Sequence, residues 1–282
     1  MPATHPYIPR VSVIFDFDRT LASDTIDALC AAWGLERKEW EQRYCDPLGD
    51  GWDGILKRGH ALIQCGRDRG EPISDAFFQK AVEHITIYPG LGRMREQLEE
   101  TARSVLAEME VELVVLSSGY IEVIERTAVA DCFDRLWAGD FHSDEETGEA
   151  VAVKRIIGHP EKALYIESYA KGLDLDTANT PQTQTPKYDP DYMRVPFDQI
   201  IYVGDGLSDL SSFEFVSSRG GLALAVNKGN DFEEAESQTQ GERVENLAPP
   251  DYTPGSELMQ SLTHAVRSAA SRAALRKMGQ GE

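Results

Sequence analysis

Val11-Ser12-Val13-Ile14-Phe15-Asp16-Phe17-Asp18-Arg19-Thr20-Leu21 is the stretch of sequence that decides the fold. Residues 11–15 are almost continuously apolar or β-branched and have the length of a buried strand. Asp16 and Asp18 follow at once, where that strand ends. On its own, such a pair is more often a turn in which an aspartate caps the next helix. Whether the two carboxylates form a site therefore depends on what the rest of the chain places beside them.

Three further segments have the same character as residues 11–15. They are residues 111–116, 200–203 and 222–226, and stretches with helical spacing separate them. This alternation is typical of a parallel sheet that is covered by helices on both faces. We therefore predict an α/β fold.

Small or acidic polar residues follow two of these segments directly. Ser117-Ser118-Gly119 comes after the second segment, and Gly204-Asp205-Gly206-Leu207-Ser208-Asp209 comes after the third. In open α/β sheets, ligands bind outside the carboxyl ends of the strands. The sequence thus predicts that three remote pieces of chain, including the one with Asp16 and Asp18, converge on one place.

The chain between the first two strands, about ninety residues, is longer than one crossover helix requires. We predict an inserted helical cap domain at residues 23–88, with helices near residues 26–33, 52–65 and 75–85. The core domain would then consist of residues 1–22 and 89–248, followed by a C-terminal helical tail at 249–282.

Smaller features complete this organisation. Leu91, Met94 and Leu98 form the core-facing stripe of a helix that follows the cap. Residues 139–153 are expected to form a surface hairpin, and residues 173–198 a long solvated insertion. A last helix is expected at residues 256–277.

The charge balance bears on the possible partners. The 282 residues include 48 acidic and 28 basic side chains, of which nine are lysines, for a formal net charge of -20. Such a surface repels nucleic acid phosphates, and we find no local basic stripe, so we expect no nucleic acid partner. Adaptation to a high-salt cytoplasm and an ordinary acidic surface explain this composition equally well.

The expected compartment is the cytoplasm. No apolar run approaches the roughly 20 residues that span a bilayer, and the first residues do not resemble a secretion signal. The four cysteines form no CxxC pair, and we expect buried or free thiols in a reducing environment. No membrane partner is therefore expected, and the oligomeric state is left open.

Clustered carboxylates repel one another unless a cation lies between them. Asp16 and Asp18 together with Asp205 and Asp209 would form such a cluster. Oxygen ligands of this kind favour Mg²⁺, a hard cation that also keeps several waters. We therefore expect Mg²⁺ as the cofactor, held by these four residues.

Taken together, these motifs resemble the haloacid dehalogenase superfamily, specifically its phosphoserine-phosphatase-like branch with a helical cap. The resemblance covers residues 11–227 and includes the DxDxTL pattern that Thr20 and Leu21 complete. It implies a Rossmann-like core, with Asp16 as the nucleophile and Asp18 as the general acid and base. It also implies that Ser117 binds the transferring phosphoryl group.

The resemblance further implies a lysine that offsets the charge of the nucleophile and the phosphate. Lys162 is the better match because Ala163, Leu164 and Ile166 begin a helix there, and Lys154 is the competing candidate. The acidic pair Asp205 and Asp209 matches the one that anchors the metal. Asp209 is either a ligand or a support for the ligands.

The substrate-binding residues that we expect are Thr20, Ser118, Gly119, Asp24 and Arg58. In phosphoserine phosphatases a cap glutamate reads the amino group of the substrate, but Thr25 stands at that spacing here and Asp24 reaches it only with a one-residue gap. Lys57 or Arg58 would replace the cap arginine that reads the carboxylate. Arg19 stands where the family usually has a small or acidic residue.

The function that we expect is Mg²⁺-dependent hydrolysis of a small-molecule phosphomonoester through an aspartyl-phosphate intermediate. The partner would be a small phosphorylated metabolite. Two alternatives remain: phosphotransfer to an alcohol through the same intermediate, and a non-catalytic protein of this fold that binds a phosphorylated metabolite.

Overall fold

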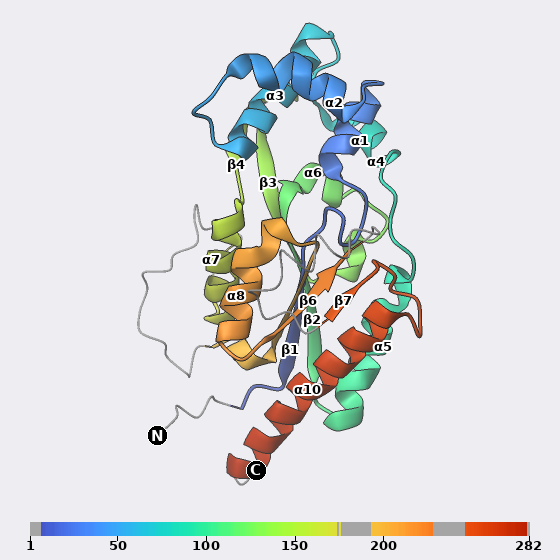
Figure 1. Cartoon of the computed structure of the whole chain (residues 1–282), viewed down its shortest axis with the longest axis vertical. Coiled ribbons are helices and arrows are strands. Elements are labelled where there is room, and N and C mark those ends of the chain that lie inside the picture. The colour runs from blue at the N-terminus through green and yellow to red at the C-terminus, as the bar shows by residue number, and fades with distance from the viewer. Residues whose placement is uncertain (1–6, 174, 176–192, 228–245, 281–282) are drawn as a thin grey trace.

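The computed structural model describes residues 7–173, 175, 193–227 and 246–280. Seven strands form one sheet in the order β4-β3-β2-β1-β5-β6-β7, parallel except for β4, which runs antiparallel to β3 (Figure 1). The predicted α/β fold is confirmed. The strands are β1 (Arg10–Phe15), β2 (Glu110–Tyr120), β3 (Arg135–Ser143), β4 (Ala150–Arg155), β5 (Ile200–Gly204), β6 (Leu222–Val226) and β7 (Asn246–Ala248).

Strand β1 is the centre of the sheet, between β2 and β5. Its side chains alternate between the two faces, as the pleat of a strand requires. Val11, Val13 and Phe15 point into one hydrophobic cluster, whereas Ile14 points into another. Both clusters are buried, which explains why the strand is almost continuously apolar.

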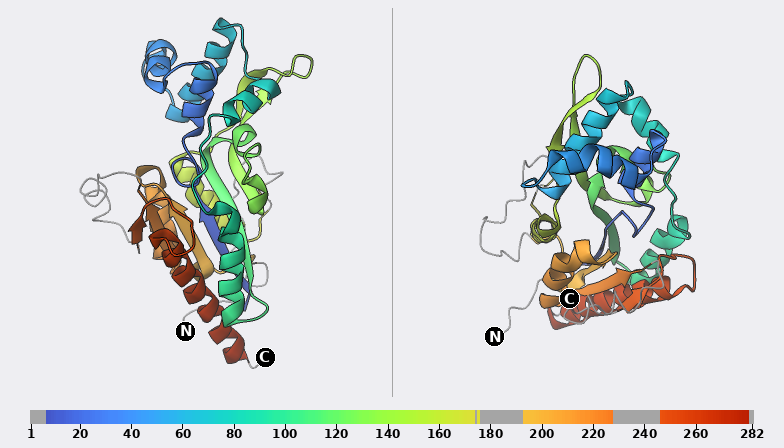
Figure 2. Two further views of the ribbon diagram at one scale, coloured as in Figure 1. Left: turned by 90° about the vertical axis from the view of Figure 1, so that its right-hand side faces the viewer. Right: turned by 45° about the horizontal axis from the view of Figure 1, so that its top comes forward.

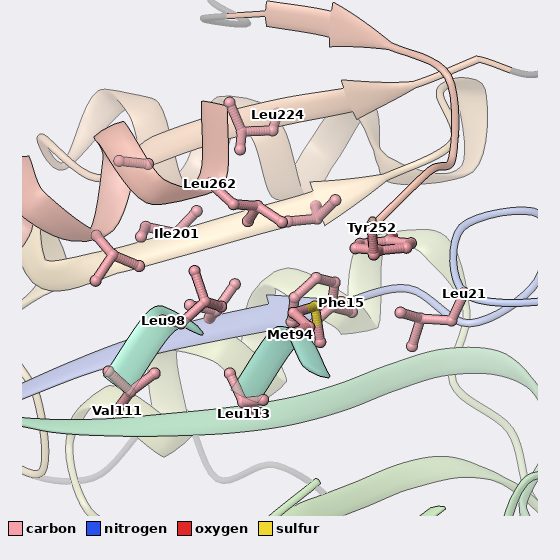
Figure 3. Close-up of a cluster of buried hydrophobic side chains, with 14 of the residues drawn as sticks. Phe15, Leu21, Met94, Leu98, Val111, Leu113, Ile201, Leu224, Tyr252 and Leu262 are labelled. Atoms are coloured by element: carbon pink, nitrogen blue, oxygen red, sulfur yellow. The ribbon is translucent and has the colours of Figure 1, made fainter. Parts of the chain in front are cut away.

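Helices cover both faces of the sheet. The cluster around Phe15 is closed by α5 (Leu91–Val105) and α10 (Glu257–Gln280), with Met94, Leu98 and Leu262 among its members (Figure 3). The helices α7 (His159–Ala170) and α8 (Leu210–Ser218) close the other face. The helix predicted at residues 256–277 is α10, and its apolar side chains from Leu258 to Ala273 belong to the main core.

The segment predicted as the cap contains four helices. They are α1 (Thr25–Ala32), α2 (Arg37–Trp40), α3 (Gly54–Asp68) and α4 (Asp75–Val82), with a π-helical turn at Glu41–Cys45 and a 3₁₀ turn at Asp46–Leu48. They lie beyond the carboxyl edge of the sheet, at the top of Figures 1 and 2. Trp40 and other buried side chains form a separate hydrophobic cluster there, to which Tyr120 and Phe141 of the core contribute. The boundaries of the two domains stay a prediction.

The sequence analysis did not predict several elements, and it misjudged another. Helix α2, the π-helical turn and strand β7 were not predicted. Residues 139–153 do form a hairpin between β3 and β4, but it is not a surface feature alone. Strand β3 begins at Arg135 and pairs in parallel with β2 inside the main sheet. Its inner residues Trp137 and Ala138 are buried.

Most of the insertion predicted at residues 173–198 lies outside the described residues. All four cysteines are free thiols, and Cys30, Cys45 and Cys65 are buried. Within the described ranges, no helix is long and apolar enough to cross a membrane.

Helix α6 (Ile121–Ile124) carries a half-buried acid, Glu122, next to the hairpin. The Phe141 N–H donates to Glu122 Oε1 at 2.8 Å, and burial raises the pKa of Glu122 to about 7, with repulsion from Asp140 adding to the effect. The folded protein therefore binds this proton more tightly than the unfolded chain does. Stability is then lost as the pH rises from about 4.5 to about 7.

We expect Glu122→Gln to remove this loss, because a glutamine does not titrate and still accepts the Phe141 hydrogen bond. Relative to the wild type, the free energy of unfolding of the variant should rise by about 2 kcal/mol between pH 5 and pH 8. Urea unfolding at both pH values measures the difference. The exposed neighbour Glu125 provides the control, since Glu125→Gln should unfold with the wild-type pH dependence. A difference between Glu122→Gln and wild type that does not grow with pH would contradict the assignment.

Candidate active site

Asp16 lies at the carboxyl end of β1, where its N–H donates to the Val203 carbonyl of β5 at 2.8 Å. Its side chain is only 4% exposed. Lys162 Nζ lies 2.8 Å from Asp16 Oδ1 and 2.7 Å from Asp209 Oδ1, and the lysine is fully buried. The lysine is thus attracted to both carboxylates and offsets part of their mutual repulsion.

The environment of Asp16 is built to hold more positive charge. Burial raises the pKa of Asp16 well above its ordinary value, Lys162 opposes this shift, and Asp209, Asp205 and Asp18 add to it. One lysine thus faces several carboxylates. An additional cation would relieve their mutual repulsion.

Asp18 is held by the start of helix α1. The Thr25 N–H donates to Asp18 Oδ1 at 2.8 Å, and the Thr25 hydroxyl donates to Oδ2 at 3.0 Å. Burial raises the pKa of Asp18 to about 7, with repulsion from Asp24 next in size, while the Thr25 hydrogen bonds lower it. A carboxyl group with a pKa near neutrality can both donate and accept a proton at physiological pH.

The loop after Asp18 turns sharply, and a residue from the C-terminal part of the chain forms a hydrogen bond with it. Arg19 has a φ of 61°, which is rare for a residue with a side chain. The Tyr252 hydroxyl donates to the Thr20 carbonyl at 2.9 Å, and its ring packs edge-on against Phe15. The Thr20 hydroxyl is buried and has no hydrogen-bond partner.

The residues that end β2 meet this loop from the other side. Ser117 is fully buried, and its Oγ accepts the Gly119 N–H at 3.0 Å. A side chain at Gly119 would bring a Cβ to 2.5 Å from Thr25 Oγ1 and 2.8 Å from Asp18 Oδ2. Only glycine therefore fits there. Ser118 lines the pocket, and within the described ranges its hydroxyl has no hydrogen-bond partner.

Asp205 and Asp209 complete the acidic cluster. Carboxylate oxygens of Asp16, Asp205 and Asp209 all lie within 4.8 Å of one another. Burial raises the pKa of Asp205 to about 6, and Asp209 adds to the shift. This donor set consists of oxygens alone and is suited to a hard divalent cation.

Asp209 is occupied by protein donors. Its Oδ1 accepts from Lys162 and from the Tyr202 hydroxyl at 2.5 Å, and its Oδ2 accepts from the Asp205 N–H at 3.1 Å and from Ser208 at 3.3 Å. Four donors leave little capacity for a ligand. Asp209 is thus arranged to hold Lys162 and the Asp205 loop in place.

A cavity of about 180 Å³ opens above these groups, between the core and the cap. This is below the roughly 300–1,000 Å³ of pockets for drug-sized ligands, so it suits a compact molecule. Its lining comprises Asp16, Asp18, Arg19, Asp24, Ile26, Arg37, Arg58, Ser118, His159, Lys162, Asp205 and Ser208.

Two of the expected contacts are engaged elsewhere. Asp24 lines the cavity, but it caps α1 by accepting from the Ile26 N–H at 2.9 Å, and Arg37 pairs with it at 2.9 Å. Lys57 donates to the Gly49 carbonyl at 2.8 Å and does not line the cavity. Arg58 does line it.

The two candidate lysines occupy different places. Lys162 reaches the nucleophile position, whereas Lys154 is 58% exposed and pairs with Asp140 at 2.6 Å. Sequence reasoning missed Tyr202, Tyr252 and His159, which carry no motif of their own. Thr25 was noted only because it stands at the spacing of the family's cap glutamate. That spacing was the one signal in the sequence that placed Thr25 near the site, where it contacts Asp18.

Comparisons with known proteins give the fold a reference. No protein-family model matches the chain. An uncharacterized protein of Borreliella burgdorferi is 21% identical over 278 residues, which cover 88% of this chain and 93% of that protein.

Several solved structures superpose on this chain over most of its length. A HAD family hydrolase from Salmonella enterica serovar Typhi superposes with a TM-score of 0.56 at 15% identity, covering 93% of this chain and 73% of the other. A phosphoserine phosphatase in apo form superposes with a TM-score of 0.54 at 18% identity, covering 90% of this chain and 98% of the other. A probable phosphoserine phosphatase from Vibrio cholerae superposes with a TM-score of 0.56 at 14% identity, covering 97% of this chain and 69% of the other. At such identities the likeness establishes a shared fold.

Proposed function

We propose that this chain, which has the fold of the HAD family hydrolases, is a phosphatase that cleaves a small phosphomonoester through an aspartyl-phosphate intermediate. The observation that carries the proposal is the position of Asp16. It is a buried carboxylate at the carboxyl end of the central strand, 2.8 Å from a buried lysine and next to Asp205 and Asp209.

Each step has a group in place. Asp16 attacks phosphorus, the bond to the leaving oxygen breaks, and Asp18 in its protonated form gives that oxygen a proton. Asp18 then takes a proton from water, which attacks the acyl phosphate and returns Asp16 with release of phosphate. Lys162 and the Ser117 and Ser118 hydroxyls would stabilise the equatorial phosphoryl oxygens.

The residues present fit Mg²⁺. The donors would be the carboxylates of Asp16 and Asp205 and the backbone carbonyl of Asp18, with Asp209 orienting them. When bound, Mg²⁺ would neutralise negative charge on the phosphoryl group. The raised pKa values of Asp16 and Asp205 support this assignment, because burial and mutual repulsion leave both short of a cation.

The predicted cap at residues 23–88 would select the substrate. Gly119 lies against Asp18 and Thr25, whereas Arg58 and Asp24 line the cavity from the predicted cap. The small cavity supports a compact phosphorylated metabolite as the substrate. The same cavity is compatible with phosphotransfer to a bound alcohol, so the acceptor must be determined by experiment.

A turnover assay tests the proposal. We expect hydrolysis of p-nitrophenyl phosphate with added Mg²⁺ and none with EDTA. Release of inorganic phosphate in water, without a need for an alcohol, would distinguish hydrolysis from phosphotransfer. Binding of phosphate esters without any turnover would instead favour the non-catalytic alternative.

Asp205→Asn should raise the Mg²⁺ concentration for half-maximal activity by about 10–100-fold, because it removes one charged ligand. The fold should persist, since Asp205 is only partly buried and its N–H still donates to Asp209. A magnesium titration of activity measures the shift. Asp50→Asn, an exposed loop variant, is the control. Unchanged metal dependence in Asp205→Asn would show that the metal lies elsewhere.

A further inference from the structure

Tyr252 lies between β7 and α10, and it contacts the chain on both sides of Asp16 and Asp18. Its ring packs edge-on against Phe15, the residue before Asp16, with the ring centroids 6.2 Å apart (Figure 3). Its hydroxyl donates to the carbonyl of Thr20, two residues after Asp18, at 2.9 Å. The side chain is fully buried. One tyrosine from the C-terminal part of the chain thus brackets the segment that carries the proposed nucleophile and the proposed general acid.

The two aspartates are not held equally firmly. Asp16 is fixed by strand pairing, because its N–H donates to the Val203 carbonyl at 2.8 Å, and by its ion pair with Lys162. Asp18 belongs to the loop at residues 17–22 and precedes Arg19, whose φ of 61° is costly for a residue with a side chain. A backbone in this conformation persists only where surrounding contacts hold it. Loss of a contact to the loop should therefore displace Asp18 more than Asp16.

Tyr252 also reaches the second connection between the core and the predicted cap. Its N–H donates to the Pro89 carbonyl at 2.9 Å. Gly90 has a φ of 90°, and a Cβ there would lie 2.1 Å from the Tyr252 carbonyl carbon, so only glycine allows this approach. The two connections also pair with each other, since the Tyr88 N–H donates to the Leu21 carbonyl at 3.0 Å. Tyr252 therefore holds both connections at once.

The segment around Tyr252 is itself well anchored. The Asp251 carboxylate accepts from the Thr253 N–H at 2.8 Å and from the Thr253 hydroxyl at 2.7 Å, which fixes the turn. Leu258 and Leu262 of α10 follow, and both are buried in the main core. The contact to the loop thus comes from a part of the chain that is fixed by the core rather than by the loop.

We propose that Tyr252 is a positioning residue, which holds the loop at residues 17–22 so that Asp18 is aligned to protonate the leaving oxygen. The inference rests on the proposed function and adds to it a residue from outside the motifs. Tyr252 does not line the cavity, so it acts through the Thr20 carbonyl and does not touch the substrate. Small displacements matter here, because a general acid must lie within hydrogen-bond distance of the atom that it protonates.

Two esters with different leaving groups test this role. Tyr252→Phe keeps the ring against Phe15 and removes only the hydroxyl, so the variant should fold. Ethyl phosphate has a poor leaving group that requires a proton from Asp18, whereas p-nitrophenolate leaves without one. We expect kcat/KM to fall by about 100-fold for ethyl phosphate and by less than about ten-fold for p-nitrophenyl phosphate, because kcat/KM reports the steps up to cleavage of the ester.

Tyr169→Phe is the matched control. Tyr169 is also buried, and its hydroxyl contacts Ser12 at 2.5 Å and Glu112 at 2.8 Å near the amino ends of β1 and β2. This variant loses comparable hydrogen bonds far from the loop, so kcat/KM for both esters should stay close to wild type. Equal losses on the two esters in Tyr252→Phe, or no loss, would overturn the positioning role. So would the same dependence on the leaving group in Tyr169→Phe.

Hydrogen exchange separates this inference from the proposed function, because it requires no turnover. The N–H groups of Arg19 and Leu21 both donate to carbonyls within the loop. In metal-free Tyr252→Phe we expect these two amides to exchange about ten-fold faster than in wild type, with the Val13 amide of β1 unchanged. That result would show that Tyr252 holds the loop even if no ester were cleaved. Unchanged loop amides, or equal acceleration at Val13, would reject the role even in an active phosphatase.

Discussion

Asp16→Asn is expected to abolish turnover, with a loss of at least about 10⁴-fold in kcat. An amide nitrogen or oxygen does not attack phosphorus to form an acyl phosphate, so the proposed intermediate cannot arise. The geometry makes this a clean test. Asparagine has nearly the same volume as aspartate, and its Oδ1 can still accept from Lys162, which lies 2.8 Å from Asp16 Oδ1.

The measurement is p-nitrophenyl phosphate hydrolysis under saturating Mg²⁺, accompanied by a thermal unfolding scan. We expect the variant to unfold cooperatively, which shows that lost activity is not lost structure. Asp131→Asn, at an exposed position far along the chain, should behave as wild type in both assays. Activity of Asp16→Asn within ten-fold of wild type would rule out Asp16 as the nucleophile.

Lys162→Met is expected to affect both activity and stability. The lysine is fully buried and pairs with Asp16 and Asp209, so its removal leaves two buried carboxylates without their cation. Breaking a buried ion pair in this way costs about 3–5 kcal/mol of the free energy of unfolding. The loss of a cation beside the phosphoryl group should lower kcat by about 100–1,000-fold.

The competing lysine supplies the matched control. Lys154→Met removes an equal charge from an exposed side chain that pairs only with Asp140. Exposed pairs contribute about 0–1 kcal/mol, so this variant should unfold and turn over almost as wild type. Urea unfolding in metal-free buffer and the phosphatase assay measure the two effects. The reverse pattern, with Lys154→Met inactive and Lys162→Met active, would exchange the roles of the two lysines.

The central architecture could be predicted from sequence because it depends on local patterns. Residues 11–15, 111–116, 200–203 and 222–226 all lie in strands of the sheet, and each run is apolar because both faces of the strand are covered. Parallel strands also end at a common edge. Three motifs at strand ends were therefore sufficient to predict that remote residues meet.

Features that depend on tertiary contacts could not be predicted from the local sequence pattern. Strand β3 joins the sheet through β2 and the hairpin, although its exposed end has the polar character of a loop. The helix predicted at residues 256–277 was correct in position, but its burial against α5 depends on the sheet beneath it. A helical pattern shows which face is apolar and does not show what will cover that face.

The sequence by itself predicted the α/β fold and the strand edge at which Asp16, Asp205 and Asp209 meet. Only the tertiary structure decided how the charges are shared. The sequence preferred Lys162 to Lys154 only because a helix begins there, whereas in the structure Lys162 is buried between two carboxylates and Lys154 is exposed. Asp24 pairs with Arg37, whereas the buried Arg58 Nε has no hydrogen-bond partner among the described residues. These distinctions depend on distances between segments that are remote along the chain, because Coulomb energy and desolvation are set by separation and burial in space.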